Sequence, residues 1–311
     1  MDCLEGFFLP GSLFDGIHPS GTPFIGWREG GYNVNKTFGV IGGDRRLVEL
    51  GRLLEERGCC VCSYGAGREE TEEALRRAAS ADVILLPLPL CGKEGLLNGT
   101  GLSTEVLFSR MRPDQLLLAG GVKETQRQEA ERYGLHLVDY FQEELKVANA
   151  AATADAALLT AMEQLDRSLL GSNCLVLGFG RIGKFLCNRL DGLGAQVTAA
   201  ARKPEDRAWI RGYGYQAREI GALSGTLDTV DVLFNTVPAL LLDETLLAQL
   251  PKSCLLVDLA SAPGMDQAAA ERLGLRSVWA RALPGRLVPR TAAEGIVRVL
   301  DRILDEGGDP S

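Results

Sequence analysis

The stretch NCLVLGFGRIGKFLCNRL, residues 173–190, decides the fold of this 311-residue chain. A short apolar run leads into the turn Gly178-Phe179-Gly180-Arg181-Ile182-Gly183, and a helix-period pattern follows the turn. In this context the first glycine allows a tight turn, the second lets a phosphate approach the backbone, and the third lets helix and strand pack closely. The turn therefore predicts a dinucleotide site at a helix N-terminus. The alternative is a domain of the same fold that has lost its cofactor.

The same pattern occurs earlier in the chain, so the two halves look like copies. VIGGDRRLVELGRLLEERGCCV (40–61) parallels VLGFGRIGKFLCNRLDGLGAQV (176–197). The first copy has Asp44 and Leu47 where the second has Gly180 and Gly183. A carboxylate at this place would repel a pyrophosphate, and the leucine would push the helix outward. We expect the first copy to keep the fold without the nucleotide, and we interpret its GGDRR segment as a domain-interface or substrate-side turn.

Short apolar runs alternate with charged, helix-period segments from Lys36 onward, which predicts parallel sheets with helices on both faces. We expect an α/β protein of two Rossmann-like domains with a binding cleft between them. The substrate-side domain would span 36–148, and the dinucleotide-binding domain with the linking helices would span 149–311. Residues 1–35 are rich in glycine, proline and aromatic residues, which is typical of a loosely ordered extension or of an upstream start.

The end of the strand after the glycine turn predicts which dinucleotide binds. Dinucleotide folds usually place an acid there, about twenty residues past the first glycine, to bind the ribose hydroxyls. Here the strand ends in two alanines followed by Arg202 and Lys203. Two cations without an acid suit a 2′-phosphate, so we expect NADP rather than NAD. The alternative is a pair of solvated surface cations with little preference.

The composition of the chain limits the kinds of function and site that it can have. A hydrophobic fraction of 46% and a charged fraction of 24% are ordinary for a globular protein, and a net charge of -8 argues against nucleic-acid binding. The sequence predicts neither a membrane span nor a secretory signal, so a cytoplasmic location is expected. The chain has eight cysteines but only two histidines, without the spacing of a metal site, so we expect reduced thiols and no metal. A cofactor would therefore have to carry the reaction.

Several longer motifs resemble a known family, the A-subunit of dipicolinate synthase from spore-forming bacteria. The resemblance covers residues 38–304 and rests on the motifs VIGGDRR, ANAAATADAA, LGFGRIGK, ARKPED, NTVP, DLASAPGMD and ALPGRLVPRTAAEGI. It implies an oxidoreductase of the mother-cell cytoplasm that converts 4-hydroxy-tetrahydrodipicolinate to dipicolinate. It also implies a partner, the B-subunit of dipicolinate synthase, and leaves association of identical copies open.

Candidate site residues fall into three groups. Arg286 and Arg290 could bind the substrate carboxylates or be solvated surface arginines. Asn149, Thr153 and Asp155 begin the interdomain helix and could move protons, or they could cap and pack that helix. Strand ends at the same sheet edge supply the remaining candidates: Thr236, Val237 and Pro238 near the nicotinamide, with Asp258 and Ser261 on the next strand.

Two other functions stay open. One is a two-domain dehydrogenase for another small amino or hydroxy acid, although that chemistry usually needs a histidine or lysine near the substrate. The other is a non-catalytic subunit that binds NADP and positions a partner enzyme, because no single indispensable acid or base stands out in the sequence.

Overall fold

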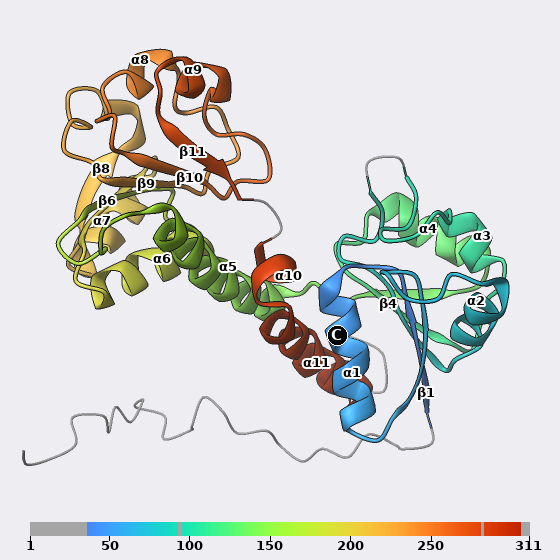
Figure 1. Ribbon diagram of the computed structural model, residues 1–311. Coiled ribbons are helices and arrows are strands. Elements are labelled where there is room, and N and C mark those ends of the chain that lie inside the picture. Colours follow the sequence, from blue (N-terminus) through green and yellow to red (C-terminus); the bar gives the residue numbers. More distant parts are fainter. Residues whose placement is uncertain (1–35, 93–94, 281–282, 306–311) are drawn as a thin grey trace, which may run out of the picture.

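The structure, a computed structural model, describes residues 36–92, 95–280 and 283–305, so the predicted extension 1–35 lies outside the described residues. The described chain forms two α/β lobes joined by a long helix (Figure 1). This confirms the predicted fold class, with two parallel sheets.

The first lobe has a five-stranded parallel sheet in the order β2-β1-β3-β4-β5. The central strands of this sheet consist almost entirely of buried apolar residues, because helices cover both faces of the sheet. Helices α1 and α11 cover one face, while α2, α3 and α4 cover the other. The elements are β1 Thr37–Ile41, α1 Arg45–Glu56, β2 Cys60–Tyr64, α2 Glu72–Ala79, β3 Val83–Leu85, α3 Thr104–Phe108, β4 Leu116–Ala119, α4 Glu124–Arg132 and β5 His136–Asp139.

The second lobe has a six-stranded parallel sheet in the order β11-β10-β9-β6-β7-β8. Helices α5, α6 and α7 cover one face, and α8, α9 and the crossover after β8 cover the other. The elements are β6 Asn173–Leu177, α6 Arg181–Gly192, β7 Gln196–Ala201, α7 Pro204–Gly212, β8 Gln216–Glu219, the 3-10 turn Ile220–Ala222, β9 Val232–Asn235, α8 Glu244–Leu247, β10 Leu255–Asp258, α9 Gln267–Arg272 and β11 Arg276–Trp279.

The connection between the lobes differs from the predicted domain boundary. Helix α5, Glu143–Gln164, has Leu145 in the core of the first lobe and Leu158 in the core of the second, so the expected boundary at 148/149 falls inside one helix. After α10, Leu283–Leu287, the chain returns to the first lobe as α11, Pro289–Asp305. The final helix therefore belongs to the first lobe rather than to the dinucleotide-binding domain, because its apolar face packs on α1 and the first sheet.

No helix in the described part of the chain is both long enough and apolar enough to cross a bilayer.

Candidate cofactor and substrate site

The glycine turn after β6 has the geometry that its sequence predicts. Gly178 has a φ of +94°, and a Cβ there would lie 2.4 Å from Thr236 Oγ1. A Cβ on Gly183 would lie 2.1 Å from the carbonyl oxygen of Gly178, so only glycine lets α6 approach β6 this closely. Around Gly180, by contrast, a Cβ would meet no atom within 4 Å. This open approach to the N-terminus of α6, where helix amides lack internal partners, fits the phosphates of a dinucleotide.

The other side chains of the turn take part in core packing and in an exposed ion pair. Phe179 is buried in the core beside Tyr213, and Ile182 packs against the same core. Arg181 donates two hydrogen bonds of 2.7 Å to Glu143, and its guanidinium lowers the pKa of that carboxyl. The side chains of these three predicted cofactor residues are engaged in packing and in an ion pair. Their main-chain amides are therefore the groups left available to a cofactor.

The end of β7 presents two cations. The Ala200 carbonyl accepts a hydrogen bond from Gly178, which ties this strand end to the glycine turn. Arg202 and Lys203 are exposed, and the structure gives neither side chain an ionic partner among the residues it describes. The acid at the end of the neighbouring strand, Glu219, lies 3.7 Å from Arg207. The strand end therefore offers two exposed cations without an ion pair next to the turn, which suits a phosphate.

Asp258, a predicted cofactor residue, is bound by groups of the protein itself. It is fully buried, and it accepts hydrogen bonds from Asn235 Nδ2 at 2.8 Å and from the amides of Ala260 and Gly264. Its carboxylate therefore holds the loop after β10 in shape. Ser261, in that loop, is exposed.

Asn235 is a residue of this edge that the sequence analysis missed. It is fully buried, and its side chain bonds both main-chain groups of Val237. The Thr236 hydroxyl donates to the Leu177 carbonyl at 2.9 Å, while Pro238 is exposed. Asn235 thus sets the turn Thr236–Pro238 beside Gly178. The signal available in the sequence was a polar residue closing an otherwise apolar strand.

The candidates on α5 are engaged with their surroundings. Thr153 donates its hydroxyl to the Asn149 carbonyl at 2.6 Å, a bond within the helix. Asp155 is exposed and pairs with Arg189 of α6. These contacts correspond to the packing interpretation of Thr153 and Asp155.

In the first lobe residues 98–99 pack directly against the turn that corresponds to the glycine turn of the second lobe. The carbonyl of Asn98 accepts a hydrogen bond from the Gly43 amide at 2.7 Å, and a Cβ on Gly99 would lie 2.1 Å from the Gly43 carbonyl oxygen. Asp44 caps α1 by accepting from the Arg46 amide, and the Arg46 guanidinium binds the same carboxylate. The turn also touches the chain that returns from the other lobe, because a Cβ on Gly285 would lie 2.7 Å from Asp44 Oδ2.

The two arginines predicted for substrate carboxylates are placed differently. Arg286, on α10, is exposed, and its carbonyl accepts a hydrogen bond of 3.1 Å from Arg45 Nη1. Arg290 binds both carboxylate oxygens of Glu56, at 3.2 and 3.0 Å, and lowers the pKa of that carboxyl. Glu56 ends α1, whereas parallel sheets bind ligands at the edge where such helices begin. Arg290 is therefore removed from the expected substrate edge, and of the two arginines Arg286 is the one whose guanidinium has no ionic partner in the described chain.

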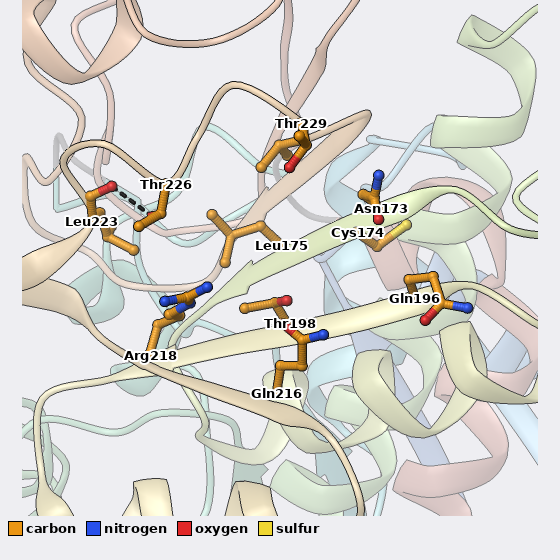
Figure 2. A pocket seen from close by; sticks show the side chains of 11 residues that line it. Asn173, Cys174, Leu175, Gln196, Thr198, Gln216, Arg218, Leu223, Thr226 and Thr229 are labelled. Atoms are coloured by element: carbon orange, nitrogen blue, oxygen red, sulfur yellow. Dashed lines mark hydrogen bonds between the residues drawn. The ribbon is translucent and has the colours of Figure 1, made fainter.

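A hollow of about 210 Å³, open to solvent, lies on the second sheet (Figure 2). Its lining includes the first residues of three strands, Asn173, Gln196 and Gln216, so it lies toward the amino ends of the strands. The Thr226 hydroxyl, at its rim, donates to the Leu223 carbonyl. Because dinucleotides bind at the carboxyl ends of parallel strands, this hollow is not the cofactor site.

The cysteines that the structure describes are free thiols. Burial raises the pKa of Cys174, Cys187 and Cys254 to about 12, so these three thiols stay protonated at neutral pH. Among the described residues, no three histidine, cysteine or acidic side chains gather in a group that could hold a metal ion.

Comparison with known proteins finds a similar family for each lobe. Residues 37–141 match the family model of the dipicolinate synthase A-subunit N-terminal domain, and residues 142–273 match "D-isomer specific 2-hydroxyacid dehydrogenase, NAD binding domain". The second match identifies the second lobe as a nicotinamide-dinucleotide-binding domain of the dehydrogenase type. Both models meet at the start of α5, a few residues before the boundary at which the longer second domain was expected.

Individual proteins show the same relationship over most of the chain. The dipicolinate synthase A-subunit of Bacillus subtilis is 27% identical over 284 residues, which cover 86% of this chain and 95% of that protein. The crystal structure of its counterpart from Bacillus halodurans superposes with a TM-score of 0.71 at 26% identity, covering 89% of this chain and 98% of that one. The Bacillus subtilis structure gives 0.70 at 25% identity, covering 87% and 96%.

Proposed function

The chain is a relative of the dipicolinate synthase A-subunit, and we propose that it is an NADP-dependent oxidoreductase that forms dipicolinate from 4-hydroxy-tetrahydrodipicolinate. The observation that carries this proposal is the open glycine turn 178–183 on a dehydrogenase-type lobe that is joined to a lobe of the dipicolinate synthase family. The proposal includes action during sporulation, a cytoplasmic location, and a complex with the B-subunit of dipicolinate synthase.

The reaction suits a site that mainly binds and orients. Loss of one water from the substrate gives a dihydropyridine dicarboxylate, and loss of a hydride and a proton then gives the aromatic ring. NADP, when bound, supplies the acceptor for the hydride. Aromatisation supplies the driving force, so the chain's task is to hold the ring against the cofactor and exclude water.

The chain's own residues would divide this task between three places. The main chain of 178–183 would hold the pyrophosphate, and Arg202 with Lys203 would bind the 2′-phosphate. Thr236, Val237 and Pro238 would line the nicotinamide end, on the turn that Asn235 and Asp258 hold in shape. Arg286 would bind a substrate carboxylate.

The test is direct. Purified chain with NADP and 4-hydroxy-tetrahydrodipicolinate should form dipicolinate, followed by its ultraviolet absorbance, together with one NADPH per product. Absence of product both alone and with the B-subunit present would contradict the proposal.

A second function has a specific observation in its favour. The ionisable candidates Asp155 and Asp258 are both bound by other groups, so the described chain assembles no free acid–base pair from them. A chain that binds NADP but needs a partner to complete the reaction would look the same. Product formed only after the B-subunit is added would support this second function.

A further inference from the structure

Two arginines without an ionic partner among the described residues, Arg45 of α1 and Arg286 of α10, meet where these two helices touch. Elsewhere in the described chain arginines commonly pair with carboxylates, as Arg181 does with Glu143 and Arg290 with Glu56. Arg45 and Arg286 form no ion pair with any residue that the structure describes. In a protein of net charge -8, adjacent uncompensated cations mark a place that would favour an anion.

The packing of α1 against α10 brings the Arg45 side chain to the main chain of Arg286. Arg45 Nη1 donates to the carbonyl of Arg286 at 3.1 Å, so the Arg45 side chain reaches the residue that carries the other cation. Gly285 lies directly against the Asp44 carboxylate, where a Cβ would come within 2.7 Å of Oδ2. This tight contact fixes the first turn of α1 against α10.

The nearest carboxylate does not neutralise Arg45. Asp44 is held by Arg46, whose Nε lies 2.9 Å from Oδ1 and whose Nη2 lies 2.8 Å from Oδ2. Arg46 is further anchored by a bond of 2.6 Å to the Leu88 carbonyl. Asp44 and Arg46 therefore form a neutral support, and the charge of Arg45 is left at the start of a twelve-residue helix, where the helix dipole adds to it.

We propose that Arg45 and Arg286 form an inter-lobe clamp for the two carboxylates of a dianionic substrate. Arg45 is then a specificity residue contributed by the first lobe, and this inference rests on the proposed function because it extends the same site. Each planar guanidinium can bind a carboxylate through two parallel hydrogen bonds. A monocarboxylate can compensate only one of the two cations, whereas a dicarboxylate compensates both. The clamp thus selects dicarboxylates over monocarboxylates.

The experiment compares binding of pyridine-2,6-dicarboxylate and pyridine-2-carboxylate, measured by calorimetry in saturating NADP. Arg45→Gln and Arg286→Gln should each weaken dicarboxylate binding by about tenfold or more, the range for a hydrogen bond to a charged group. The ratio of dicarboxylate affinity to monocarboxylate affinity should fall in the same two variants. Arg45→Lys, which keeps the charge, should recover part of the loss.

Arg52→Gln is the matched control. Arg52 lies on the same helix, but its charge is taken up by Glu49, so the substitution should change neither carboxylate affinity. NADP affinity, measured on the same samples, should be unchanged in all variants, and equal melting temperatures would show that the fold is intact.

Three results would overturn the clamp: an Arg45→Gln variant with unchanged dicarboxylate affinity, equal losses in Arg52→Gln, or a wild-type chain that binds both pyridine acids equally. The proposed function can fail separately. If the chain binds the dicarboxylate through both arginines but forms no dipicolinate, the clamp stands and the proposed reaction is wrong. If it forms dipicolinate and Arg45→Gln keeps the wild-type KM, the reaction stands and the clamp is wrong.

Discussion

At the scale of single residues, the side chains at the carboxyl edge of the second sheet are of two kinds. Some are exposed and available to a ligand, and others are buried and stabilise the loops. Arg202 and Lys203 are exposed and form no ion pair with the residues that the structure describes, whereas Asp258 accepts hydrogen bonds from three donors. A carboxylate with three hydrogen bonds in a buried position is costly to disturb, because its donors would be left without partners. Asp258 therefore holds the geometry of its loop, and the proposed role of the first pair is contact with a ligand.

The cofactor prediction belongs to this scale. Because two free cations occupy the place of the ribose acid, NADP should bind at least several-fold more tightly than NAD. Changing Arg202 to Asp and Lys203 to Ala should reverse this order, since the new carboxylate repels a 2′-phosphate and accepts from ribose hydroxyls. Fluorescence titration with both reduced cofactors measures it. Equal curves for NADPH and NADH on the unmodified chain would contradict the assignment.

Thiol reactivity follows from burial. Cys174, Cys187 and Cys254 have a pKa of about 12 against an ordinary value near 9, since burial disfavours the thiolate. The folded state therefore binds these protons more tightly, and the stability this gives is present below pH 9 and is lost as the pH rises from 9 toward 12. At pH 8 iodoacetamide should modify exposed Cys60 while the three buried thiols react only after unfolding. Mass spectrometry of native and denatured samples checks this, and rapid native labelling of Cys187 would refute it.

At the scale of elements, the close contact between α6 and β6 depends on the absence of a side chain at Gly183. Gly183→Ala would place a Cβ 2.1 Å from the Gly178 carbonyl oxygen, so α6 must move away from the strand. We expect a loss of stability of about 1–3 kcal/mol, as for overpacking, and weaker NADP binding because the helix N-terminus moves with it. Chemical unfolding and cofactor titration measure the two effects.

Gly192→Ala is the control within the same helix. A Cβ there meets nothing within 4 Å, and alanine is the better helix former, so stability should stay level or rise by up to about 1 kcal/mol. Equal losses in both variants would show that the effect does not come from the contact with Gly178.

Elements also show what the sequence could and could not predict. The turn 178–183 was predictable because its geometry depends on neighbouring residues. Strand β8, Gln216–Glu219, lies at the sheet edge and carries mostly polar, exposed residues, so no apolar run in the sequence marks it. Arg290 and Glu56 are 234 positions apart, so their pairing depends on where the final helix lies. No local pattern contains that information, and the role of Asp258 depends in the same way on the path of its loop.

At the scale of the whole molecule, the chain crosses between the lobes twice. Helix α5 passes from the first core to the second, and α10 leads back to α11 in the first core (Figure 1). The two crossings bring α10 against the first turn of α1 and so create the contact between Asp44 and Gly285. A fragment that ends at residue 148 would lack α11 and would leave one face of the first sheet partly uncovered.

The position of α11 gives the last prediction. Leu300 is 1% exposed and packs in the core formed by α1, α11 and the first sheet. Leu300→Ala should cost about 2–5 kcal/mol, the range for a buried leucine truncated to alanine. Because this core belongs to the first lobe, hydrogen exchange should increase in β1 and β3 while β6 and β7 keep their protection and NADP still binds. Leu247→Ala, in a core on the other sheet, is the counterpart and should raise exchange around β6 and β9 instead. If Leu300→Ala loosened the second lobe first, α11 would be stabilising the dinucleotide domain, and the predicted boundary at residue 149 would describe the molecule better than the packing does.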